Sequence, residues 1–265
     1  MAKQKMFTIK ENLKTLKDIP IPEGTTKLIC QGINLESLEG CPDTVTELNC
    51  SNNKLTSLQG CGINVIRLDV SYNNLESLEF CPASVKELRC SRNKIKSLEH
   101  LKKTALINIG CSYNHMINLI GCPATVKSMV CVSNFLTSLD GLPYKMDKLY
   151  CSYNKLETLE NSPIVTNLDC SCNIIKSLKG CPEGVVELTC SNNLLTSLEG
   201  CPNSVIILRC SSNLLSKLHG CPDGLKLLEC TKNNIISFDN SLKKIDEIFC
   251  DNDMKKQLFY ASDIL

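Results

Sequence analysis

Apolar and polar residues follow one another along the chain in a pattern that repeats every 20 residues. The pattern is easiest to follow from one column of cysteines, in which valine stands once. An apolar residue lies five and two positions before most members of this column, asparagine lies three after, and leucine or a related residue lies five and eight after. A fixed period of this length is typical of a solenoid in which each repeat forms one coil. The column holds Cys30, Cys50, Val70, Cys90, Cys111, Cys131, Cys151, Cys170, Cys190, Cys210, Cys230 and Cys250.

Each coil is predicted to contribute one short strand. Leu48 and Cys50 lie two residues apart, which places both side chains on one face of a strand and Asn49 on the other. Stacked coils then form a parallel sheet of about eleven or twelve strands, with the face of Asn49 open to solvent. Proline follows cysteine in most return segments, which favours extended or polyproline geometry there and predicts few or no helices.

The spacing L-x-x-L-x-C-x-x-N-x-L-x-x-L resembles the signature of leucine-rich repeats, with cysteine at the third apolar position. The short period is similar to the 20-residue repeats of bacterial effector proteins. The stretches "CSYN" and "SLEGCP" look closest to leucine-rich-repeat proteins of giant amoeba-infecting viruses. The resemblance implies a right-handed leucine-rich-repeat solenoid, curved into a horseshoe or arc, with the parallel sheet on its concave side.

The chain is expected to form one solenoid domain over residues 1–265. Residues 1–24 are interpreted as a degenerate N-terminal cap, because the stretch from Leu13 keeps the leucine spacing without the strand cysteine. About eleven repeats follow over residues 25–250, and residues 251–265 are expected to cover the last coil as a C-terminal cap. The apolar residues of that cap are Leu258, Phe259, Ile264 and Leu265.

The asparagine and cysteine columns are interpreted as internal structure. The amide of Asn53 and its equivalents both donates and accepts hydrogen bonds, so we expect a buried ladder at the turn that leaves each strand. Val70 replaces cysteine in the strand column, and Leu101 and Leu142 replace it in the return column, so the thiols are predicted to pack as compact hydrophobes. A line of thiols does not converge as tetrahedral zinc requires, so no metal and no cofactor are expected. Cys172 departs from both columns, and its expected place on the open face is consistent with an incidental surface thiol or a reactive one.

Composition bears on partners and location. The formal net charge is +1, which gives no electrostatic reason to expect nucleic acid or an acidic membrane as a partner. The 19 cysteines are an odd number, the start of the chain lacks the apolar core of a secretory signal, and no apolar run approaches a membrane span. We therefore expect no signal peptide or transmembrane segment and a reducing intracellular location, the host cytoplasm if the viral resemblance holds.

No catalytic residues are expected. His100, His115 and His219 occupy different columns, so no histidine recurs beside a nucleophilic side chain. The serines after the cysteines are interpreted as strand-end residues that form local hydrogen bonds. Bacterial effectors with similar repeats often carry a ubiquitin-ligase domain after them, but about fifteen residues follow Cys250, so that activity is not expected.

The candidate partner-binding residues come from the columns that vary. The residue before each strand cysteine changes freely, and the residue two after it is often tyrosine or arginine in the middle of the chain. Both types are enriched at binding hot spots, because they bury a large area at modest entropic cost. A solvated sheet face with tyrosines stacked on their neighbours is the alternative. The candidate patch holds Asp69, Tyr72, Arg89, Arg92, Tyr113, Tyr150 and Tyr153.

Charged residues also alternate in sign across neighbouring coils. Glu47, Arg67 and Glu87 form one such row, and Asp69 lies beside Arg89 in the next. Lateral salt bridges are the first interpretation of these rows, and selection of a partner is the second.

These patterns favour a non-enzymatic module that binds a partner protein on the concave face, a host protein if the viral resemblance holds. No nucleic-acid, membrane or small-molecule partner is expected. A structural component that self-associates through its ends is the main alternative. An effector that has lost its catalytic domain is the weaker one.

Overall fold

The computed structural model describes residues 5–236 and 245–251, so most of the predicted C-terminal cap lies outside the described residues. Contacts between Cα atoms divide the chain into two compact units. Unit 1 comprises Met1–Phe135 with Gly141–Pro143, and unit 2 comprises Leu136–Asp140 with Tyr144–Leu265.

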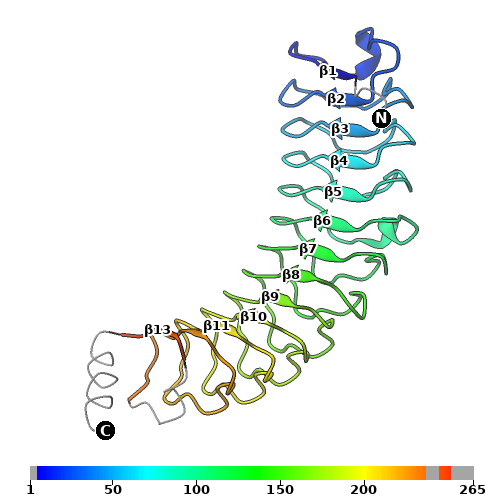
Figure 1. The fold of residues 1–265 in the computed structure, drawn as a ribbon. Helices are drawn as coiled ribbons and strands as arrows, with labels where there is room; N and C mark the ends of the chain where they lie inside the picture. The colour runs from blue at the N-terminus through cyan, green and yellow to red at the C-terminus, as the bar shows by residue number, and fades with distance from the viewer. Residues whose placement is uncertain (1–4, 237–244, 252–265) are drawn as a thin grey trace. The chain divides into compact units, whose positions relative to one another are not determined.

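Both units are parallel β-solenoids built from strands of three residues each (Figure 1). Within a unit, each strand pairs in parallel with the strand of the next coil, and equivalent residues of the repeat stand side by side, as Leu48 does with Leu68. In unit 1 the strands are β1 (Met6–Thr8), β2 (Lys27–Ile29), β3 (Glu47–Asn49), β4 (Arg67–Asp69), β5 (Glu87–Arg89), β6 (Asn108–Gly110) and β7 (Ser128–Val130). In unit 2 they are β8 (Lys148–Tyr150), β9 (Asn167–Asp169), β10 (Glu187–Thr189), β11 (Ile207–Arg209), β12 (Leu227–Glu229) and β13 (Glu247–Phe249).

The predicted fold class is confirmed, but strand β1 was missed. The described residues hold thirteen strands, and β1 lies in the segment interpreted as a degenerate cap. Ile9 occupies the position of the strand cysteine there, is 3% exposed, and donates its backbone N–H to the carbonyl of Ile29 at 2.8 Å. An alignment built on cysteine therefore passes over a coil that uses isoleucine for the same packing.

Helix is nearly absent from the described residues, as predicted. The helical segments there are two single-turn 3₁₀ helices of unit 1, η1 (Leu16–Asp18) and η2 (Glu99–Leu101). In each of them one leucine is buried. No helix in residues 5–236 and 245–251 is long and apolar enough to cross a membrane.

The interior of each coil is filled by the apolar columns. Leu48, Cys50, Leu55 and Leu58 are at most 2% exposed, and the same positions are buried in the following coils. Cysteines of the strand column such as Cys50, Cys90 and Cys190 are 0% exposed among apolar side chains, which confirms that this column packs as compact hydrophobes. Burial disfavours the charged thiolate and raises the pKa of Cys81 to about 12.

The predicted asparagine ladder is also confirmed. The side-chain amide of Asn73 donates to the carbonyls of Cys50 and Val70, both at 3.0 Å, and its Oδ1 accepts the backbone N–H of Leu55 at 2.9 Å. One buried amide thus forms two hydrogen bonds to the preceding coil and one within its own coil. The ladder satisfies backbone groups at the turn after the strand, where no neighbouring strand can reach them.

Glycine sets how closely the return segments approach. Gly60 has φ +83°, and a Cβ built on it would lie 2.7 Å from the backbone nitrogen of Glu39 in the preceding coil. Phe80 stands at the equivalent position of the next coil and adopts φ +64°. A bulky side chain in the left-handed region is uncommon, and here it leaves the ring of Phe80 55% exposed.

Candidate interaction surface

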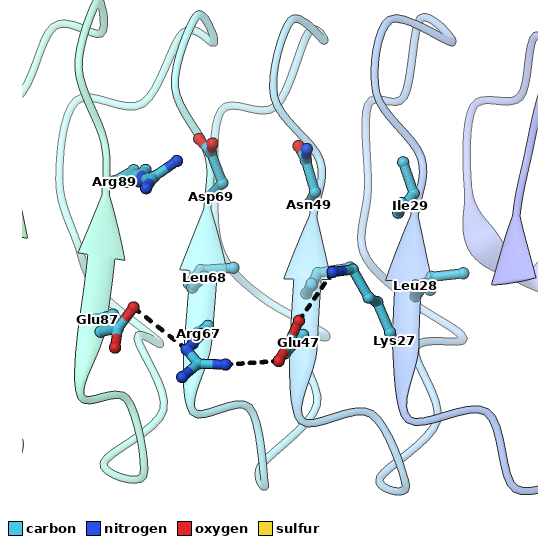
Figure 2. A pocket seen from close by; sticks show the side chains of 11 residues that line it. Lys27, Leu28, Ile29, Glu47, Asn49, Arg67, Leu68, Asp69, Glu87 and Arg89 are labelled. Atoms are coloured by element: carbon cyan, nitrogen blue, oxygen red, sulfur yellow. Dashed lines mark hydrogen bonds and ion pairs between the residues drawn. The ribbon is translucent and has the colours of Figure 1, made fainter. Parts of the chain in front are cut away.

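The open face is the sheet surface that carries the first and third residue of each strand. In unit 1 the first residues of β2 to β5 form a continuous row of ion pairs from strand to strand (Figure 2). Glu47 accepts from Lys27 at 3.1 Å and from Arg67 at 2.7 Å, and Arg67 also pairs with Glu87 at 3.2 Å. The hydrogen bond from Lys27, and then that from Arg67, lowers the pKa of Glu47. Lateral salt bridges are thus confirmed for this row.

The third residues of the same strands form a second row, in which the charges are not paired (Figure 2). Asp69 and Arg89 are register partners on β4 and β5, yet they form no ion pair. Asp69 instead accepts the backbone N–H of Ser71 at 3.0 Å through Oδ1. The guanidinium of Arg89 has no hydrogen-bond or ion-pair partner among residues 5–236 and 245–251, and its side chain is exposed.

Two shallow hollows lie on this part of unit 1. The first has a volume of ≈ 280 Å³ and lies between the two rows on β2 to β5. The second has a volume of ≈ 450 Å³ and is lined by Gln31, Ser51, Asn52, Asp69, Ser71 and Tyr72. Asp69 lines both hollows, so they adjoin at the end of β4.

Beside these hollows, three residues of the candidate patch form a stack. The guanidinium of Arg92 lies 5.2 Å from the ring centroid of Tyr72 and 4.2 Å from that of Tyr113. The two tyrosines are 55% and 48% exposed, respectively. Consecutive coils therefore present an aromatic, cationic and aromatic side chain in contact with one another on an exposed edge.

The backbone of this stack was not predicted. Tyr72, Arg92 and Tyr113 all have φ 56°, in the left-handed region that ordinary side chains avoid. The coils from Gly32 to Lys232 all turn in the same way at this position, and Asn52 and Asn192 fill it in two of them. Asparagine tolerates left-handed geometry, so its presence in the column was a signal that could have found the turn.

The last two residues of the candidate patch belong to unit 2. Tyr150 is the third residue of β8 and is half-buried. Tyr153 lies at φ 56° and is 62% exposed. The structure thus brings Asp69, Tyr72, Arg89, Arg92 and Tyr113 together within unit 1 and places the two remaining tyrosines in the other unit.

An apolar row of unit 2 was missed as a surface feature. Ile174, Leu194 and Leu214 stand four residues after the strand cysteine in three consecutive coils and are 41%, 38% and 47% exposed. Lys54 and Lys94 fill the same position in unit 1. The change from lysine to aliphatic residues along one column was visible in the sequence.

Within residues 5–236 and 245–251, no three histidine, cysteine or acidic side chains are grouped so as to hold a metal ion. The ring of His115 lies 6.0 Å from that of Phe135. Cys172 is half-buried and occupies the left-handed turn position at φ 53°.

Comparison with known proteins identifies the fold. No protein-family model matches the sequence, and no curated protein matches it. The solved structure of YopM from Yersinia enterocolitica is 23% identical, with a TM-score of 0.69 over 92% of this chain and 63% of that one. The leucine-rich repeat domain of APL1B is 20% identical, with a TM-score of 0.72 over 89% of this chain and 80% of that one.

A third similar structure is the functional domain of InlJ from Listeria monocytogenes, which is described as including a cysteine ladder. It is 22% identical, with a TM-score of 0.67 over 85% of this chain and 53% of that one. The present chain therefore spans less than two thirds of the YopM and InlJ structures. At these identities the likeness establishes the leucine-rich-repeat fold.

Proposed function

We propose that this chain is a non-enzymatic protein-binding module and that the open face of unit 1 contacts the partner. The centre of the surface is the stack of Tyr72, Arg92 and Tyr113, with Arg89 and Asp69 beside it. The observation that carries the proposal is the stack itself, in which the guanidinium of Arg92 lies 5.2 Å and 4.2 Å from the ring centroids of Tyr72 and Tyr113 while both rings remain about half exposed. The left-handed turn recurs in the other coils, so it is the choice of tyrosine and arginine at this position, and not the turn, that distinguishes the stack.

The energies favour binding over mere stacking. A left-handed backbone costs an ordinary residue about 1–2 kcal/mol, so the three residues together cost about 3–6 kcal/mol. Two exposed cation–π contacts contribute about 0.5–1 kcal/mol each. The stack therefore stabilises the fold by less than its backbone costs, and asparagine at the same positions is the better choice for stability alone. Tyrosine and arginine are the better choice for a contact surface, because they bury large areas on binding.

The location proposed for this module is a reducing compartment. The chain has 19 cysteines, many of those in the strand column are buried in the core, and burial also raises the pKa of the return-column thiol of Cys122 to about 12. Protein thiols stay reduced in the cytosol, whereas oxidising compartments favour disulfides. If the chain is viral, as its repeat sequence suggests, the partner is a host protein.

The test uses a variant in which Tyr72, Arg92 and Tyr113 are all replaced by asparagine. We expect this variant to fold with an unchanged or higher melting temperature and to lose the partner that the wild type captures after crosslinking in native cells and mass spectrometry. The control is Lys232→Asn, which changes the same turn position in unit 2. Equal recovery of the same partners by the triple variant and the wild type contradicts the proposal.

A further inference from the structure

We propose that the partner presents an acidic peptide segment, and that one of its Asp or Glu carboxylates binds Arg89 and Arg92 together. The inference rests on the function proposed above and specifies the chemistry of the partner at that surface. Unit 1 neutralises some of its surface charges internally and leaves others without a partner charge.

The first row of the open face needs no partner charge. Lys27 and Arg67 supply two positive charges, and Glu47 and Glu87 supply two negative ones, all within the ion pairs of Figure 2. A partner that binds to this row must break an existing pair. The charges of this row are therefore paired with one another, and none of them requires a charge from the partner.

Arg89 is the unmet charge of the second row. Its nearest acidic register partner, Asp69, directs Oδ1 to the backbone N–H of Ser71 at 3.0 Å. On its other side Arg89 stands opposite Gly110 of β6, which has no side chain. The guanidinium is therefore exposed, without a partner among the described residues, and next to a strand that leaves room for an incoming group.

Arg92 is a second cation whose orientation is already restricted. The rings of Tyr72 and Tyr113 lie at 5.2 and 4.2 Å and occupy the space around its guanidinium, while no described residue accepts a hydrogen bond from it. Guanidinium N–H groups point outward in the plane and match the two oxygens of a carboxylate. Because the rings hold the side chain in place, less conformational entropy is lost when a carboxylate binds.

The two arginines act on one ligand because they belong to one coil. They are three residues apart, so their Cα atoms are separated by at most about 11 Å, a span that two long side chains converging on one group cover easily. Around them the only nearby acidic side chain of the second row is Asp69, which leaves Arg89, Arg92 and Asp69 with a net charge of +1. A single carboxylate on the partner restores neutrality.

The experiment pans a random dodecamer peptide library on the immobilised full chain. We expect the recovered peptides to be enriched in Asp and Glu relative to the input library. A synthetic copy of an enriched peptide should bind the wild type at least about tenfold more tightly than it binds the double variant Arg89→Gln, Arg92→Gln, since each lost charged hydrogen bond is worth about that factor. Arg92→Lys keeps the charge without the planar fork and should recover only part of the affinity.

The control variant is Arg209→Gln. Arg209 occupies the same repeat position as Arg89, but it lies in unit 2 and is paired with Glu229 at 3.0 Å. The substitution Arg209→Gln removes one positive charge from the chain outside the proposed site, so peptide binding should be unchanged. Circular dichroism of each variant verifies that the coils remain folded.

The remaining outcomes separate the two proposals. Recovered peptides without an excess of Asp or Glu, binding the double variant as tightly as the wild type, overturn the acidic-segment inference and leave the protein-binding function standing. Failure of the wild type to recover any peptide above the level of the Tyr72→Asn, Arg92→Asn, Tyr113→Asn variant overturns both. Equal losses with the double variant and with Arg209→Gln also overturn the inference, because they indicate a general charge effect.

Discussion

Replacing Gly200 by alanine brings a new Cβ within 2.7 Å of the backbone nitrogen of Lys179 and 2.9 Å of the carbonyl carbon of Leu178. Real Cβ atoms do not approach backbone atoms so closely, so the two return segments must move apart. Gly200 also has φ +88°, where alanine is strained whatever space surrounds it. The substitution therefore tests whether glycine sets the stacking distance of the coils or merely permits the turn.

Gly184 provides the matched control. It lies in the same unit at φ +92°, but the nearest atom to its Cβ is Cγ2 of Ile164 at 3.9 Å, an ordinary contact. Gly184→Ala therefore carries the backbone strain without the collision. That strain is about 1–2 kcal/mol, reduced by about 0.4–1 kcal/mol because alanine has fewer conformations than glycine in the unfolded chain.

The free energy of unfolding of Gly200→Ala should be about 1–3 kcal/mol lower than that of Gly184→Ala, because forcing extra atoms into a packed interior usually costs that much. The free energy of unfolding is measured by urea denaturation followed by circular dichroism, with wild type, Gly184→Ala and Gly200→Ala compared at one pH. A difference between the two variants smaller than about 0.5 kcal/mol, the usual scatter of such substitutions, would refute the close-approach argument. The coils would then be separated by something other than the glycine contact.

Three more predictions concern stability. Asn193→Ala removes the amide that donates to the carbonyls of Cys170 and Cys190 and accepts from the backbone N–H of Ile175, so the free energy of unfolding should fall by about 2–4 kcal/mol. The control Asn234→Ala, at an exposed residue, should change it by less than about 0.5 kcal/mol. Similar losses for both variants would contradict a stabilising role of the asparagine ladder. Phe80→Gly should raise the free energy of unfolding by up to about 1.5 kcal/mol, because the relief of about 1–2 kcal/mol of strain at φ +64° is offset in part by the greater freedom of glycine in the unfolded chain. A decrease in urea denaturation would show that the ring has a packing role. Burial raises the pKa of the Cys81, Cys122 and Cys181 thiols from 9.0 to about 12 in the folded state, so the unfolded state binds fewer protons above pH 9 and stability should decrease as the pH rises from 9 towards 12. The test compares the melting temperature of the wild type over that pH range with that of a variant in which Cys81, Cys122 and Cys181 are changed to valine. The melting temperature should fall more steeply with pH in the wild type, and parallel curves would exclude the thiols as the cause.

The repeat itself could be predicted from the sequence because its signals are local. A leucine and a cysteine two residues apart must share one face of a strand, whichever coil they belong to, and repetition at a period of 20 turns that rule into columns. The buried position of Asn73 and the packing of Cys50 follow from the same argument, since each column has one environment throughout a solenoid. Substitutions within a column, such as Val70 for cysteine, showed which property the position requires.

The features that the sequence did not predict lack a side chain that marks them. Strand β1 lacks the cysteine on which the alignment was built, although Ile9 packs in the same place. The left-handed turn at Tyr72 and Arg92 is a backbone property that most side chains in that column conceal, because they are types that usually avoid it. The sequence predicted which residues share the surface but not the conformation in which they are held.

The sequence by itself determined the coil, its buried columns and the list of exposed candidates, because these follow from spacing along one chain. Only the tertiary structure decided which charges on that surface are already neutralised. Arg67 and Arg89 occupy adjacent strands and look equivalent in the sequence, yet Arg67 pairs with Glu47 at 2.7 Å while the carboxylate beside Arg89 is engaged by a backbone amide. Pairing depends on the directions of side chains from neighbouring coils, and those directions are set only when the coils are stacked in register.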